Sequence, residues 1–266
     1  MKRTWLIPMS IAGLIALYAA VYAWQPGGVE RLKTLTDTLF ATFALLATAL
    51  AWKASRMFEP GMAQRRVWLL LSAGMAVLTS AQLLWIYYHV FLGQTGTRLS
   101  FADILWAISY LPILASLILQ HRALGIGTSL RFKLVILITY LAALAVTLVI
   151  LLWPVLINPG SGAVIEVLVA AYYLVCDLSM IFIAALSLLI LWNGLVSRPW
   201  QYIIGSILLL ALTDLVFAYG VWNKLYATGS NVLSGIVDTG YLLAYLVAAA
   251  GAYQQVTLSL PPIPVE

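Results

Sequence analysis

Residues 201–222 read QYIIGSILLLALTDLVFAYGVW, a run that is apolar almost throughout and carries Asp214 in its interior. An α-helix rises ~1.5 Å per residue, so a run of this length crosses a hydrocarbon core of roughly 30 Å. A carboxyl group in hydrocarbon is costly and is most often functional. The stretch therefore predicts a transmembrane helix with a buried acid that needs an explanation.

The composition shows that this stretch is typical of the chain. Hydrophobic residues make up 64% of the sequence and charged residues 9%, and the mean hydropathy is +1.01. These values lie outside the soluble globular range and predict an all-α polytopic membrane protein with eight transmembrane helices. The spans are expected near residues 4–24, 34–53, 67–92, 101–120, 132–156, 163–193, 201–222 and 232–254.

A polar pattern recurs in the two halves of the chain. Residues 82–87, QLLWIY, are echoed by residues 214–219, DLVFAY. Two further pairs of echoes are Asp103, Trp106 and Tyr110 with Asp238, Tyr241 and Tyr245, and Asp37 and Trp52 with Asp177 and Trp192. The pattern predicts two tandem four-helix repeats, residues 1–128 and 129–254, followed by a short tail, 255–266. Since each repeat has an even number of spans, both would enter the membrane in the same direction.

The basic residues are distributed unevenly between the two sides of the predicted bundle. Ten of the 14 Lys and Arg residues fall on the side of the N-terminus, and the other side receives only Arg31, Lys33, Arg98 and Lys224. Because cytoplasmic loops are enriched in Lys and Arg, this bias places both termini in the cytoplasm. The net charge of +5 is spread over short loops, so it indicates attraction to membrane lipids and not a nucleic-acid surface.

The acids of the spans should face a common space. Measured along each helix from its cytoplasmic end, all of them are expected in the outer half of the membrane, ~18 to 25 Å from that end. This arrangement predicts an outward-facing acidic and aromatic pocket above an apolar floor. The candidate ligand-binding residues are Asp177, Asp214, Asp238, Asp37, Asp103, Gln82, Trp85, Trp106, Tyr110, Tyr219, Tyr241 and Tyr245.

Each candidate also has a structural interpretation. Asp103 and Asp238 lie near helix starts, where a carboxylate satisfies free backbone amides, and Ser100 with Asp103 fits a capping box. Asp177 and Asp214 lie too deep to be caps, so they must be protonated, paired, bonded to Tyr or Thr, or exposed to water in a cavity. Such acids can also simply hold helices together. Aromatic residues near an interface can form an ordinary belt.

Several function classes lack their sequence signals. The spans carry no mid-membrane lysine for a retinal Schiff base, and the single cysteine, Cys176, excludes a multi-cysteine metal or cluster site. His89 and His121 are expected at opposite faces, as solvated interfacial residues. No phosphate-binding loop, zinc motif or nucleophile elbow is present. We therefore expect no catalytic residues, no enzyme activity and no metal site, and the sequence indicates no particular cofactor.

The polar pattern resembles a known class of membrane region. Residues 99–106, LSFADILW, with Tyr110 and Pro112, and residues 214–219 with 238–245, are similar to the multi-span N-terminal sensory regions of bacterial diguanylate cyclases, phosphodiesterases and histidine kinases. The resemblance implies a protein of the bacterial inner membrane that senses an external or lipid-borne cue. Only about a dozen residues follow the last expected span, so any output is expected to pass through a separate protein partner.

The preferred interpretation is thus a sensory or ligand-binding membrane protein. Two alternatives remain open. One is a small transporter that couples a proton or a cation to substrate movement through the intramembrane acids. The other is a non-catalytic subunit of a larger respiratory or photosynthetic complex.

Overall fold

The chain folds into a bundle of long helices. The computed structural model describes residues 5–93, 100–124, 130–157, 163–190 and 198–258, and within these ranges all regular structure is helical, with no strand. Eight helices are long and apolar enough to cross a membrane, which confirms the predicted all-α, eight-span architecture. The helices are α1 (Leu6–Trp24), α2 (Val29–Ser55), α3 (Ala63–Ile86), α4 (Phe101–Ala123), α5 (Leu130–Ile157), α6 (Ala163–Ile190), α7 (Arg198–Trp222) and α8 (Val232–Leu258).

Two helices have local features that the predicted spans did not include. α2 begins five residues before the predicted span because Lys33 bonds to Glu30 at 2.8 Å, one helical turn away, and so the charged residues continue the helix. α3 runs on into a π-helical turn, η1 (Tyr87–Phe91), which includes His89. A π-turn changes the direction in which the following side chains point, and such turns are frequent at functional sites.

The start of α4 has the predicted capping box. Both the backbone N–H and the hydroxyl of Ser100 donate to Oδ2 of Asp103, each at 2.7 Å. These bonds hold the carboxylate at the first turn, where it also complements the helix dipole. Pro112 lies inside the same helix, which continues to Ala123.

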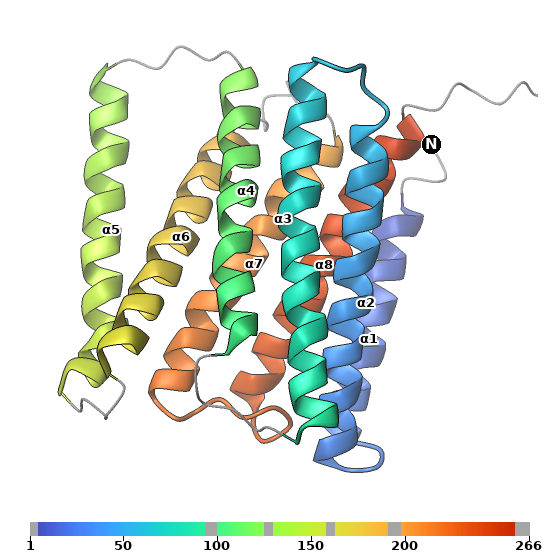
Figure 1. The fold of residues 1–266 in the computed structure, drawn as a ribbon, viewed down its shortest axis with the longest axis vertical. Coiled ribbons are helices and arrows are strands. Elements are labelled where there is room, and N and C mark those ends of the chain that lie inside the picture. The colour runs from blue at the N-terminus through green and yellow to red at the C-terminus, as the bar shows by residue number, and fades with distance from the viewer. Residues whose placement is uncertain (1–4, 94–99, 125–129, 158–162, 191–197, 259–266) are drawn as a thin grey trace, which may run out of the picture.

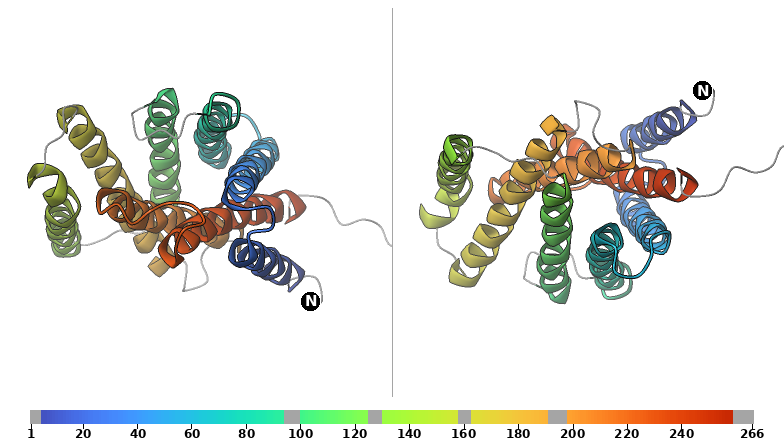
Figure 2. Two further views of the ribbon diagram at one scale, coloured as in Figure 1. Left: turned by 90° about the horizontal axis from the view of Figure 1, so that it is seen from below. Right: turned by 90° about the horizontal axis from the view of Figure 1, so that it is seen from above.

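Six helices contact one another in a closed order, α2–α3–α4–α6–α7–α8, and α8 returns to α2. α1 packs on α8, and α5 packs on α6 and α7. Figure 2 shows α7 and α8 along one side of the bundle, facing the arc formed by α2, α3, α4 and α6. We call the end at which α2, α4, α6 and α8 begin the lower end, as drawn in Figure 1, and the opposite end the upper end.

Small residues let these helices approach closely. α2 and α8 face each other with buried alanines, among them Ala44, Ala47, Ala244 and Ala248. Lipid is as apolar as the helices, so the hydrophobic effect does not drive membrane helices together. They associate instead through the close packing that such small residues allow. α1 and α5, in contrast, leave most of their side chains exposed, as expected of helices that face lipid.

Candidate functional site

Two of the buried acids meet at one tyrosine. The hydroxyl of Tyr110, on α4, lies 2.8 Å from Oδ1 of Asp177 on α6 and 3.1 Å from Oδ2 of Asp214 on α7. Tyr241, on α8, donates to Oδ1 of Asp214 at 2.5 Å. We call these four residues the central acid cluster. They connect four helices, and Asp177 is almost completely buried, with 2% of its surface exposed.

The hydrogen bonds of this cluster depend on how many protons its groups carry. A tyrosine hydroxyl carries one hydrogen and has two acceptor lone pairs. It can therefore donate to only one of the two carboxyl groups. Both contacts of Tyr110 are hydrogen bonds only when the other carboxyl group is protonated and donates to the Tyr110 oxygen. The geometry thus suits two acids that hold one proton between them.

Aromatic rings fill the space around the central acid cluster. Phe40 lies against Tyr241 with ring centroids 5.8 Å apart, and Tyr173 lies 5.6 Å from Tyr110. One helical turn further along α8, the hydroxyl of Tyr245 accepts a hydrogen bond of 3.2 Å from the Gln82 side chain. The rings lower the local polarity, which strengthens the bonds of the two acids to their tyrosine partners.

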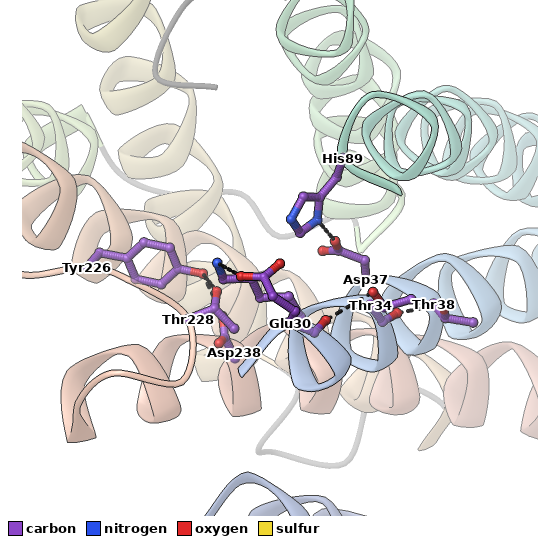
Figure 3. Close-up of polar contacts among 9 residues, drawn as sticks. Glu30, Thr34, Asp37, Thr38, His89, Tyr226, Thr228 and Asp238 are labelled. Atoms are coloured by element: carbon purple, nitrogen blue, oxygen red, sulfur yellow. Dashed lines mark hydrogen bonds and ion pairs between the residues drawn. The ribbon is translucent and has the colours of Figure 1, made fainter. Parts of the chain in front are cut away.

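A second group of acids lies towards the lower end. Nδ1 of His89, in η1, lies 2.6 Å from Oδ2 of Asp37 on α2, and the two side chains form a largely buried hydrogen-bonded pair. On α8, Oδ1 of Asp238 accepts a hydrogen bond of 2.6 Å from Tyr226, in the connection between α7 and α8. Figure 3 shows both pairs, with Asp37 and Asp238 on neighbouring helices. We call these four residues the lower acid cluster.

Tyr226 acts as a hydrogen-bond donor in this cluster. Its burial, and then the negative charge of Asp238, raise the pKa of its phenol above the usual range. The hydroxyl therefore keeps its hydrogen and donates it to Asp238. The other oxygen of Asp238, Oδ2, is buried and has no hydrogen-bond partner among the residues that the structure describes. A buried acceptor without a partner is costly and is characteristic of strained or functional positions.

The connection that carries Tyr226 is tied to the first hairpin of the chain. The backbone N–H of Gly229 donates to the hydroxyl of Tyr22 at 2.7 Å, and the side chain of Gln25 donates to the carbonyl of Gly229 at 2.6 Å. Gly229 has a φ of 78°, a conformation that favours glycine. α1 and the turn after it therefore position the lower acid cluster.

The predicted site residues do not all converge. Asp177, Asp214, Tyr110 and Tyr241 form one cluster, with Tyr245 and Gln82 beside it. The remaining candidates have other settings: Asp37 and Asp238 in the lower acid cluster, Asp103 in the helix cap, Trp85 and Trp106 in a tilted ring contact with centroids 5.8 Å apart, and Tyr219 pointing outwards with 43% exposure. Trp192, Arg98 and the tail from residue 259 lie outside the described residues.

Several acids that were expected to line one chamber bond directly to neighbouring side chains in the part of the chain that the structure describes. The acids separate into two clusters and a cap, and aromatic rings occupy the space between them. An apolar hollow of ≈ 20 Å³ lies on the upper side of Tyr245, lined by Ala47, Ala51, Ala244 and Ala248 among others. This volume has room for about one water molecule.

Some residues of the site were not found from the sequence. His89 was expected to be solvated, but the π-turn of η1 directs it to Asp37, and its side chain is only 15% exposed. Tyr226 lies in a connection between spans, where its spacing gave no helical signal. Tyr173 donates to the backbone carbonyl of Asp103 at 2.7 Å and thereby joins α6 to α4. A tyrosine on an apolar helix was the available signal, but its spacing could not identify the partner.

The geometry of the two acid clusters is the basis on which a function can be proposed for this chain. No protein-family model, curated protein or solved structure matches it.

Proposed function

We propose that this protein is a sensory or ligand-binding protein of the bacterial inner membrane, and that its input is the binding of positive charge at the central acid cluster. One observation carries the proposal: the carboxyl groups of Asp177 and Asp214 approach the same Tyr110 hydroxyl, which has one hydrogen to share. Two acids in this position bind a proton, or in its place a cationic group, more readily than isolated acids do.

The position of the cluster suits a signal that is passed on through helix packing. Its members come from α4, α6, α7 and α8, and each bond crosses between two helices. When both carboxyl groups are ionised, they repel each other and one bond to Tyr110 is lost. The arrangement of the four helices would then differ between the protonated and the ionised state, which is the requirement for a sensor.

The upper half of the bundle favours this function over transport. A transporter that uses these acids needs a polar route from the cluster to the upper end. Above Tyr245, the hollow is lined by alanine, leucine, isoleucine and methionine, and Ser206 is the one other polar side chain in its lining. An apolar floor of this kind favours binding from one side.

We further propose that the two halves are tandem repeats. The closed order of helices supports this, because α2–α3–α4 and α6–α7–α8 follow each other around it, with α4 against α6 and α8 against α2. A twofold axis along the membrane normal would relate these contacts. The outer helices depart from the pattern, since α1 packs on α8 whereas α5 packs on α6 and α7. The repeat is therefore proposed for three pairs of corresponding helices, α2 with α6, α3 with α7 and α4 with α8, and not for α1 with α5.

The proposal includes cytoplasmic termini and an output through a separate protein partner. α1 begins and α8 ends at the upper end, which is also where most Lys and Arg residues lie (Figure 1). The positive-inside rule then makes the upper end cytoplasmic and the acid clusters extracytoplasmic. Chemical cross-linking in native membranes followed by mass spectrometry tests for the partner.

Infrared difference spectroscopy tests the central claim. The protein is reconstituted in lipid nanodiscs and titrated with acid, and the carbonyl band of a protonated carboxyl group is followed. We expect this band in the wild type, and we expect it to be lost or shifted in Asp177→Asn and in Asp214→Asn. Asp103→Asn is the matched control, because Asp103 accepts two hydrogen bonds from Ser100 at the start of α4 and takes no part in the central acid cluster.

A second measurement follows the response of the helices to pH. Amide hydrogen exchange of α4 and α6 should depend on pH in the wild type and in Asp103→Asn, and should lose that dependence in the Asp177→Asn, Asp214→Asn double variant. An unchanged carbonyl band and unchanged pH dependence in the double variant would disprove the proposal.

A further inference from the structure

An open groove lies on the outer surface of α2 and α3, far from the acid clusters. Its volume is ≈ 800 Å³, and its lining is almost entirely apolar. Its lining includes the small side chains of Ala49, Ala73 and Ala76 and the larger ones of Leu45 and Leu119. Because the small alanine side chains leave a depression between larger ones, the surface is shaped to accept a flexible apolar chain.

The dimensions of this groove match one half of a bilayer. Along α3, its lining extends from Arg66 to Ala76, ten residues, which corresponds to ~15 Å at the helical rise. The hydrocarbon core of a bilayer is roughly 30 Å thick, so each leaflet contributes about half of it. The groove therefore has the length of an acyl chain that belongs to the leaflet at the upper end.

The upper end of the groove changes from apolar to basic. Trp52 and Arg66 line it there, and both side chains are exposed. Tryptophan favours the boundary between hydrocarbon and headgroups, and arginine can bond a phosphate with two parallel N–H donors. Within the described residues, no carboxylate forms an ion pair with Arg66.

The charge around this mouth favours an anionic occupant. The connection from Lys53 to Arg66 has four basic residues, Lys53, Arg56, Arg65 and Arg66, and one acid, Glu59. Basic groups beside a gap between transmembrane helices are a recurring setting for anionic lipid headgroups. A zwitterionic lipid gains less from this excess of positive charge, because its own cation opposes the charge of its phosphate.

We propose that the groove binds a single anionic phospholipid. Its phosphate lies on Arg66, Trp52 lies at the boundary between headgroup and chain, and one acyl chain lies over Ala49 and Ala73. This site is specific, unlike the general contact of the apolar helices with lipid. It is independent of the acid clusters, so it stands or falls separately from the proposed sensory function.

Native mass spectrometry of the full chain tests the proposal. The delipidated protein in detergent is titrated with phosphatidylglycerol or with phosphatidylcholine of the same acyl chains. We expect one phosphatidylglycerol molecule to bind more tightly than phosphatidylcholine. Arg66→Gln should weaken phosphatidylglycerol binding about fivefold, the effect of one cation near an anionic headgroup, and should weaken phosphatidylcholine binding less, because the choline cation already opposes the charge of the phosphate. Ala73→Leu, which fills the groove, should weaken both.

Two matched controls separate the groove from general effects. Arg131→Gln removes one exposed positive charge at the start of α5, and Ala145→Leu enlarges an exposed alanine on the same helix. Both should bind lipid as the wild type does. Equal affinity for the two lipids, wild-type affinity in Arg66→Gln, or an equal loss in Arg131→Gln would each overturn the proposal. Because Arg66 and Ala73 are exposed, both groove variants should fold, which circular dichroism checks.

Discussion

Gly74 on α3 lies so close to Ile113 on α4 that a β-carbon at position 74 would stand 2.5 Å from Cγ1 of Ile113. The same β-carbon would stand 3.1 Å from the backbone carbonyl oxygen of Ser109. A backbone atom cannot move aside as the end of a side chain can. Glycine is therefore required where these two helices meet, next to Pro112.

This contact predicts that Gly74→Ala destabilises the protein by about 1 to 3 kcal/mol, the usual effect of forcing extra volume into a packed site. The free energy of unfolding, measured by denaturant titration in mixed micelles, checks the effect. Gly205→Ala on α7 is the control, because its β-carbon would meet no atom within 4 Å. It should be neutral or stabilising by up to about 1 kcal/mol, the helix-propensity difference. Equal losses in the two variants would contradict the close contact.

The central acid cluster predicts a specific role for one hydroxyl group. Tyr110→Phe removes the group that bonds to Asp177 and Asp214, and so should destabilise the protein by about 1 to 2 kcal/mol, since both acids lose a partner. Tyr219→Phe removes the hydroxyl of an exposed tyrosine and should change stability by less than about 0.5 kcal/mol. Thermal unfolding in detergent, followed by circular dichroism, compares the two.

The close contact of Asp37 and His89 predicts energetic coupling between α2 and η1. The single variants Asp37→Asn and His89→Gln should each destabilise the protein, and the double variant should lose less than the sum of the two. A double-mutant cycle should give a coupling energy of about 0.5 to 2 kcal/mol, the range for contacting residues. Additive losses would show that the 2.6 Å contact contributes nothing to the fold.

The charge bias predicts the orientation of the bundle. In a Cys176→Ala background, a cysteine at Gln64 lies at the upper end and one at Ser230 lies at the lower end, and both positions are exposed. In intact cells, a membrane-impermeant maleimide should label the cysteine at 230 and not the one at 64, because the upper end is expected in the cytoplasm. The reverse labelling would invert the proposed topology and place the acid clusters on the cytoplasmic side.

Much of the candidate site was accessible from the sequence, because acids and tyrosines are rare among the apolar residues of the spans. Asp177 and Asp214 were expected to be protonated, paired, bonded to Tyr or Thr, or exposed to water, and Tyr110 and Tyr241 were among the candidate ligand-binding residues. The cap formed by Ser100 and Asp103 was also predicted, since its residues are neighbours in the chain. What these cases share is a signal that depends on residue type or on short spacing.

The rotation of each helix was not accessible in this way. In a soluble bundle, an apolar stripe marks the face that points inwards, but in a membrane both the lipid and the core are apolar. Tyr219 and Tyr241 therefore looked equivalent in sequence, although one is exposed and the other bonds to Asp214. The partner of Asp37 was hidden for a related reason, because the π-turn before His89 changes the direction of that side chain.

The sequence by itself determined that this chain forms eight membrane-length helices and which few polar groups they carry, because span length and residue chemistry are local properties. Only the tertiary structure decided which of those groups meet. Tyr110, Asp177 and Asp214 are up to 104 positions apart in the chain. The packing of α4, α6 and α7 brings a carboxyl oxygen of each acid within 3.1 Å of the Tyr110 hydroxyl. Such contacts depend on how small residues let helices approach and turn, which no single span encodes.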